Sequence, residues 1–100
     1  MADYSLTNKA TADLEDIYDY SITMFGLDQA RSYVLGLHRL FKTLAENPTM
    51  GRPAEVIGLD IRRLEYRSHV TFYREGENAV EIIRVLHKSR DVPSVFSNQP

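Results

Sequence analysis

The segment from Ile61 to Leu86 limits the possible folds more than any other part of the chain. It holds three runs rich in Val, Ile, Phe and Tyr, over residues 61–66, 69–74 and 79–86. The links between these runs have only two and four residues. Because parallel strands need a crossover of about a dozen residues or more, such short links predict antiparallel neighbours in a meander.

The last of these runs is apolar on both faces, which predicts a position inside the sheet. A strand inside a sheet needs a neighbour on its far edge. Residues 3–7 alternate Tyr4 and Leu6 with Ser5 and Thr7, the pattern of a short half-buried strand. This N-terminal strand is the only candidate for that edge.

Between the strands, the apolar spacing changes from two residues to three or four, which is typical of amphipathic helices. One helix is predicted from about Asn8 until Gly26 ends it, and its core stripe holds Ala10, Leu14, Ile17 and Met24. A second is predicted until Asn47-Pro48, with a stripe of Ala30, Val34, Leu37, Phe41 and Leu44. The short connection predicts an antiparallel helix hairpin.

Several residues have predicted roles around these helices. Thr7 or Asn8 is expected to cap the first helix, and Asp28 the second. Gly36, inside the second helix, predicts a close approach of the two helices. Residues 47–54, rich in Pro and Gly, are expected to form a loop.

Together the patterns predict a two-layer α+β domain with the element order βααβββ. An antiparallel helix hairpin packs on one face of a mainly antiparallel four-stranded sheet. The 100 residues give room for one such domain, residues 1–100, with a tail from about residue 93 that is expected to be flexible.

Composition excludes several classes of site. The chain has no cysteine, which rules out disulfides, thiolate zinc sites and a cysteine nucleophile. Its three histidines are dispersed, so no metal site and no cofactor are expected. No stretch approaches the roughly 18 apolar residues of a membrane span, and a cytoplasmic location is expected.

The formal net charge of -2 hides an asymmetry between an acidic first half and a mildly basic second half. The chain has nine arginines and three lysines, which fits a protein that binds an anionic partner. An ion-paired surface explains this excess of arginine equally well. Non-specific binding to nucleic acid by the chain alone is not expected. The acids Asp13, Glu15, Asp16 and Asp19 are expected on an exposed helix face.

Six segments within residues 4–92 share their order and spacing with a known family. They read ADLEDIYDY (12–20), FGLDQA (25–30), NPTMGR (47–52), RR (62–63), SHVTFYR (68–74) and IRVLH (83–87), and Asp91 follows them. Together they resemble the ParE branch of the RelE/ParE toxin superfamily. The resemblance implies a RelE-like fold with sheet order 1-4-3-2, which agrees with the edge argument for the N-terminal strand.

The resemblance also implies a function: the toxin of a bacterial type II toxin-antitoxin pair that poisons DNA gyrase. It implies a ParD-like ribbon-helix-helix antitoxin whose C-terminal segment wraps the toxin in a hetero-oligomer. The helix hairpin beside an arginine-rich sheet is suited to such a segment, which would fold on binding.

The candidate residues for contacts with the antitoxin or the target are Arg62, Arg63, Tyr73, Arg74, Arg84, His69 and His87. Arg84 and the Arg62/Arg63 pair are the first candidates for pairing with antitoxin carboxylates. The alternative is that these arginines satisfy glutamates of neighbouring strands, with Glu65, Glu75 and Glu81 available.

The second functional hypothesis is a RelE-like endonuclease that cuts messenger RNA on the ribosome. Such cleavage needs a base, an acid and cations around the phosphate, for which His69, His87, Arg63, Arg74 and Arg84 are available. The tyrosine that active relatives carry after the last strand is absent, because Lys88-Ser89-Arg90-Asp91 stands there. No catalytic residue is therefore assigned, and a non-enzymatic toxin is favoured.

Overall fold

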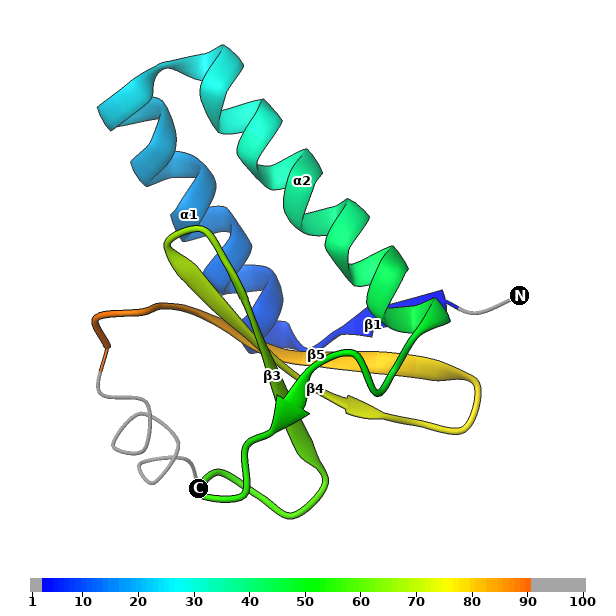
Figure 1. Cartoon of the computed structure of the whole chain (residues 1–100). Helices are drawn as coiled ribbons and strands as arrows, with labels where there is room; N and C mark the ends of the chain where they lie inside the picture. The colour runs from blue at the N-terminus through cyan, green and yellow to red at the C-terminus, as the bar shows by residue number, and fades with distance from the viewer. Residues whose placement is uncertain (1–2, 91–100) are drawn as a thin grey trace.

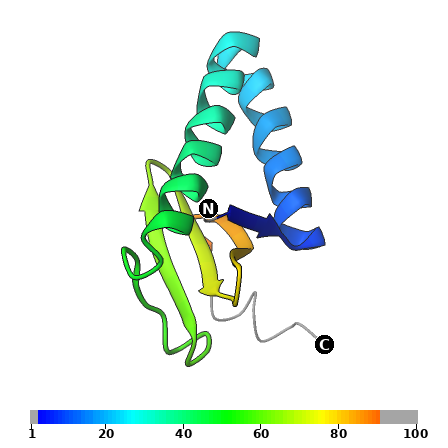
Figure 2. The same cartoon turned by 90° about the vertical axis from the view of Figure 1, so that its right-hand side faces the viewer.

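The computed structural model describes residues 3–90, and it consists of a helix hairpin packed on one face of a sheet (Figure 1). The chain runs through β1 (Asp3–Leu6), α1 (Asn8–Phe25), α2 (Leu27–Glu46), β2 (Arg52–Pro53), β3 (Ile61–Tyr66), β4 (His69–Glu75) and β5 (Ala79–His87). Seen from the side, the closed end of the hairpin projects well beyond the sheet (Figure 2). The α+β class and the helix hairpin are as predicted.

The sheet differs from the prediction in strand number and order. It has five strands in the order β1-β5-β4-β3-β2, with β1 parallel to β5 and all other pairs antiparallel. The prediction of four strands in the order 1-4-3-2 is therefore wrong. Residues 47–54 were expected to be only a loop, but Arg52 and Pro53 pair with Arg63 and Arg62 of β3. Pro53 is tolerated there because proline has no backbone N–H to donate, and the outer side of an edge strand has no neighbour that needs such a donor.

Each helix begins and ends at a residue with a local physical reason. The Thr7 side chain accepts a hydrogen bond from the backbone N–H of Ala10, which caps α1 as predicted. Gly26, at a φ of 92°, follows α1 and directly precedes α2, so the expected Asp28 cap is wrong. Asp28 instead lies in the first turn of α2, where its charge still favours the helix dipole.

The sheet separates two apolar clusters. The larger lies between the helices and the sheet and includes Leu14, Ile17, Leu37, Phe41, Tyr73, Val80, Ile82 and Val85. The smaller is built on Ile61, Val70, Phe72 and Leu86, with Ala54 from the loop after β2. Met24, predicted for the core stripe of α1, is instead 55% exposed at the projecting end of the hairpin.

A bulge in β5 explains why the larger cluster takes both Ile82 and Val85. Tyr73 of β4 pairs with Ile82 and Phe72 pairs with Arg84, so Ile83 is an extra residue without a partner in β4. The bulge changes the alternation of faces, and Val85 therefore points to the same side as Ile82.

Gly36 has a different neighbour from the one predicted. A Cβ atom added at this position would overlap the hydroxyl group of Tyr66 on β3. The glycine therefore allows a close approach of α2 to the sheet, and the predicted close approach of the two helices at this point is wrong.

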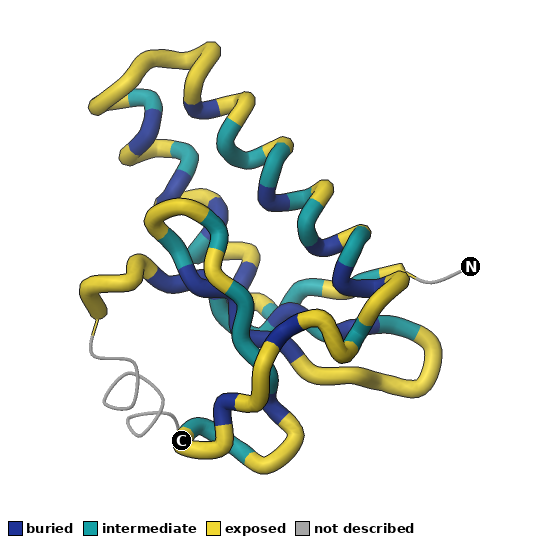
Figure 3. Tube along the Cα trace, in the orientation of Figure 1, coloured by how far each residue is buried: buried dark blue, intermediate teal, exposed yellow. Residues whose placement is uncertain are grey.

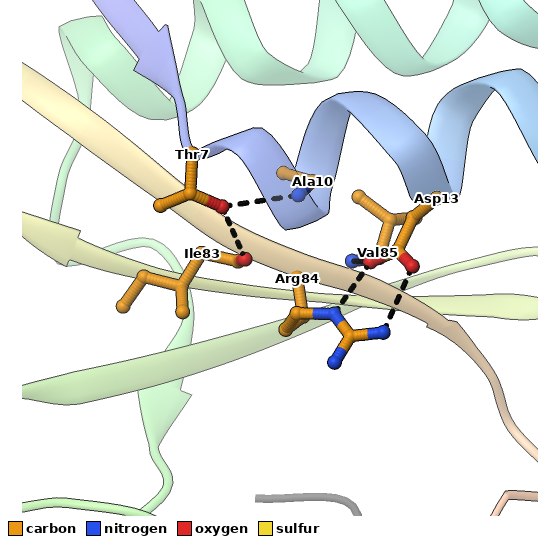
Figure 4. A network of polar contacts seen from close by, with 6 residues as sticks. All are labelled: Thr7, Ala10, Asp13, Ile83, Arg84 and Val85. Carbon is orange, nitrogen blue, oxygen red and sulfur yellow. Dashed lines mark hydrogen bonds and ion pairs between the residues drawn. The ribbon is translucent and has the colours of Figure 1, made fainter. Parts of the chain in front are cut away.

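Asp13 is the clearest departure from the sequence pattern. Its carboxylate accepts bonds from Nε and Nη2 of Arg84 at 2.8 and 2.9 Å, and from the Val85 N–H at 3.0 Å (Figure 4). The side chains of Asp13 and Arg84 are only 12% and 14% exposed. The expectation of a solvated Asp13 is wrong, because this turn of α1 lies along β5.

The same edge of β5 receives polar partners in succession as β1 ends. The Thr7 N–H donates to the carbonyl of Ile82 at 3.0 Å, and its hydroxyl donates to the carbonyl of Ile83 at 2.7 Å. Asp13 then takes the N–H of Val85. The start of α1 thus continues the hydrogen bonding of β1 along an edge that would otherwise be left unpaired.

Replacing Arg84 by Met should destabilise the fold by about 3–5 kcal/mol, because it leaves the Asp13 carboxylate buried without its countercharge. The matched control is Arg74→Met, whose ion pair with Glu81 is largely exposed, at 49% and 36% for the two side chains. That variant should lose only about 0–1 kcal/mol. Urea unfolding of both variants measures the difference, and equal losses would contradict a special role for the Asp13–Arg84 pair.

Candidate functional site

Tyr73 and Arg62 hold the loop before β2 against the sheet. The Tyr73 hydroxyl accepts from the N–H of Gly51 and donates to the carbonyl of Pro48, both at 2.8 Å. Burial of this side chain raises the pKa of Tyr73. Arg62 donates from Nη1 to the carbonyl of Gly51 at 2.7 Å. Both predicted residues thus have partners inside the chain.

The other predicted arginines also contact side chains of the same chain. Arg74 bonds Glu81 at 2.8 Å, which is the cross-strand pairing left open as an alternative. Arg63 lies over the ring of Phe72, at 5.6 Å from its centre, and 3.9 Å from Glu65. Arg84 bonds Asp13, and this bond raises the pKa of Arg84. A role for these arginines in partner binding stays a prediction.

His69 and His87, by contrast, come together at a place that is open to solvent. His69 begins β4 and pairs in register with His87 at the end of β5. Their ring centres are 5.4 Å apart, and the rings are nearly perpendicular, at 84°. His69 is half-buried and His87 is exposed. These two predicted residues therefore form one local site.

Tyr33 of α2 fixes the inner histidine. Its hydroxyl is hydrogen-bonded to Nδ1 of His69 at 2.7 Å and accepts the N–H of Ser68 at 3.3 Å. Burial raises the pKa of Tyr33, while the bond from Ser68 acts in the opposite direction. Burial also lowers the pKa of His69, and the nearby His87 lowers it further, whereas Asp13 raises it. His69 is thereby held toward its neutral form.

Two adjoining hollows meet at the histidine pair, and we call them together the histidine trough. One, of about 330 Å³, runs between α1 and the end of β5. The other, of about 370 Å³, lies beneath the projecting end of the helix hairpin. They share Tyr20, His69 and His87, and their further lining includes Asp13, Asp16, Arg90, Ser21, Phe25, Tyr33, Arg67 and Ser68.

The helix wall of the trough is unusually apolar for a surface. Tyr20 and Phe25 are 62% and 58% exposed, and Met24 and Leu27 are exposed beside them. Figure 3 shows the closed end of the hairpin as a continuous exposed stretch, which corresponds to residues 23–29. Exposed aromatic residues beside a hollow mark an interaction surface.

The chemistry of the trough favours recognition over metal binding. In residues 3–90, no group of three or more His, Asp or Glu residues is placed to hold a metal ion. Imidazole, phenol and guanidinium groups instead offer hydrogen bonds and positive charge beside an apolar wall.

Within residues 3–90, neither helix is long and apolar enough to cross a membrane.

Sequence reasoning missed three residues of this site: Tyr20, Phe25 and Arg67. Tyr20 and Phe25 belong to α1, where the sequence pattern does not separate core positions from groove positions, and the structure leaves both exposed. Arg67 lies in the two-residue link between the predicted strands of residues 61–66 and 69–74. The available signal was an arginine in a two-residue hairpin link, where Gly, Asn or Asp is usual.

Acid should weaken folding through His69. The pKa of His69 in the folded chain lies below the ordinary 6.5. As the pH falls past 6.5, the unfolded chain therefore binds more protons than the folded chain. The contribution of this group is complete above about 6.5 and is lost toward lower pH. His69→Gln should therefore show a shallower loss of unfolding free energy between about pH 7.5 and pH 5.5 than the wild-type chain. Identical slopes in urea titrations would contradict this account.

Comparison with known proteins places this geometry in a family. The model of the ParE toxin of type II toxin-antitoxin systems, parDE, matches residues 4–92. A Toxin ParE1 of Caulobacter vibrioides is 46% identical over 89 residues, which cover 89% of this chain and 92% of that protein. A Toxin ParE1 of Mycobacterium tuberculosis is 39% identical over 90 residues, with the same two coverages.

A solved structure has the same fold. A chain of the chromosomal ParDE TA system from P. aeruginosa superposes with a TM-score of 0.75 at 28% identity. The match covers 87% of this chain and 96% of that chain. With a family match across nearly all of the described residues and a shared fold, this chain belongs to the ParE toxin family of type II toxin-antitoxin systems.

Proposed function

We propose that this ParE-family toxin inhibits DNA gyrase and is neutralised by a ParD-like ribbon-helix-helix antitoxin. The observation that carries the proposal is the family match over residues 4–92. The strand segments resemble the gyrase-poisoning branch of the superfamily rather than the ribonuclease branch. Gyrase is therefore the proposed target. Because gyrase acts on chromosomal DNA, the proposed place of action is the cytoplasm.

The arrangement of the arginines supports a toxin that works by binding. A ribonuclease of this fold needs cations gathered around the scissile phosphate. In this chain Arg62 donates to the backbone carbonyl of Gly51. Arg74 pairs with Glu81, and Arg84 pairs with Asp13. The bonds of Arg62 and Arg84, which are partly buried, hold these two guanidinium groups within the fold, and this supports a toxin that works by binding.

One observation favours the second candidate, a RelE-like ribosome-dependent endonuclease. His69 and His87 lie side by side, and proton transfer by two imidazoles is a common means of cleaving RNA. The residues after β5, Lys88-Ser89-Arg90, supply no tyrosine to complete that site. The nuclease therefore remains the alternative.

Purified toxin should block DNA supercoiling by gyrase and increase the amount of cleaved DNA trapped on the enzyme. A double variant, His69→Gln with His87→Gln, should keep this inhibition, because glutamine still forms hydrogen bonds and binding needs no proton transfer. For a nuclease, the same substitutions should reduce message cleavage on ribosomes by about 100-fold or more. Untouched supercoiling together with histidine-dependent cleavage of message would reverse the two candidates.

The antitoxin part of the proposal has its own test. We expect the operon to encode a short ribbon-helix-helix protein in a reading frame next to that of the toxin. Its co-expression should restore growth of cells that produce the toxin, and the purified protein should restore gyrase supercoiling. Growth that is normal without the antitoxin would mean that the chain has lost its toxicity and acts only as a binding module.

A further inference from the structure

The histidine trough has the features of a docking site for one end of a peptide. We propose that it seats an apolar anchor side chain of the antitoxin between Tyr20 and Phe25, with a carboxylate of the same segment on Arg67. The inference rests on the proposed function, because it names where the antitoxin of that system binds. It moves the charged contact away from Arg62, Arg63 and Arg84, which the sequence favoured.

The apolar half of the proposal comes from the position of the hairpin. The closed end of α1 and α2 projects beyond the sheet (Figures 1 and 2), and Tyr20 and Phe25 of α1 are both more than half exposed. They border the hollow of about 370 Å³, which has Tyr33 among its lining residues. This volume accepts one large side chain, and an anchor of that kind excludes water from the polar groups around it.

The charged half comes from Arg67. Its guanidinium lies over the ring of Tyr66, at 5.7 Å from the ring centre, and forms no ion pair with any residue from 3 to 90. It differs in this from Arg74 and Arg84, whose carboxylate partners belong to the chain. Arg67 is thus a positioned cation at the rim of the trough, and it has a bidentate fork to offer.

The backbone of Arg67 gives an independent reason to assign it a role. Its φ of 52° is the only positive value at a non-glycine residue among residues 3–90. Glycine or asparagine adopts this conformation with less strain in a two-residue hairpin turn. An arginine is unfavourable there for folding, as expected of a residue whose side chain serves binding.

Charge at the other end of the trough favours a peptide over nucleic acid. The hollow between α1 and β5 is lined by Asp13, which Arg84 neutralises, and by Asp16 and Arg90, which are exposed and have no ion pair within the described chain. These groups give this end of the trough no excess of positive charge that would attract a chain of phosphates. A peptide needs only one carboxylate on Arg67 and one apolar anchor between Tyr20 and Phe25, and the trough offers both contacts.

The test uses the full-length chain and the full-length antitoxin encoded beside it, with the dissociation constant measured by calorimetry. Arg67→Gly should weaken binding about tenfold or more, while it raises the midpoint of urea unfolding, because the turn strain is relieved. Arg39→Gln, at an exposed arginine of α2 outside the trough, should leave the dissociation constant unchanged. The opposite changes in binding and stability exclude a general loss of structure.

The apolar anchor is tested in the same way. Phe25→Ala should weaken antitoxin binding about tenfold or more, whereas Leu35→Ala, at an equally exposed position of α2, should have no effect. Wild-type affinity in both Arg67→Gly and Phe25→Ala would overturn the inference and leave the proposed function standing. A wild-type chain that does not bind the antitoxin at all would overturn both.

A final arm distinguishes the peptide from nucleic acid. A fluorescent single-stranded RNA of about ten nucleotides, titrated with the chain alone, should show no binding that depends on Arg67. Tight RNA binding that is lost in Arg67→Gly would assign the trough to nucleic acid and overturn the peptide assignment.

Discussion

The carboxylate of Asp13 is the contact on which the arrangement of the two layers depends. It binds the guanidinium of Arg84 and the N–H of Val85 at the same time, so it joins α1 to β5 by charge and by backbone hydrogen bonding. Apolar packing alone is non-directional and would allow the helix to slide along the strand. The bidentate bond, together with the Thr7 cap, fixes the register between helix and strand. It thereby sets the position of Tyr20 and Phe25 relative to the histidine pair.

Much of the fold follows from patterns within single elements. The cap at Thr7, the break at Gly26 and the short links of the meander each act through residues close in sequence, and the structure contains all three. The features that were missed depend on contacts between distant elements. Asp13 looks like a surface acid until β5 is beside it, and Gly36 looks like a helix contact until Tyr66 is placed. Neither neighbour can be identified from periodicity alone.

Two further misses have the same origin. A two-residue strand such as β2 has no period to detect, and its pairing depends on Tyr73 and Arg62 holding the preceding loop in place. The bulge at Ile83 is hidden because every residue around it is apolar or has a long side chain, so either face is acceptable from the sequence. In the site, His69 and His87 were identified from the resemblance and the strand ends. Their contact required the register between β4 and β5.

The distribution of arginines explains why a strand position alone does not identify the cation that binds a charged partner. In a domain of this size a large share of the residues lies at the boundary between core and solvent, and long cationic side chains are used there to satisfy carbonyls and carboxylates. Arg62, Arg74 and Arg84 are used in this way. A strand position therefore increases the chance that an arginine is neutralised by its own chain, since cross-strand neighbours lie within reach. A turn such as that of Arg67 has fewer such neighbours, and a cation held there keeps its capacity to bind a partner.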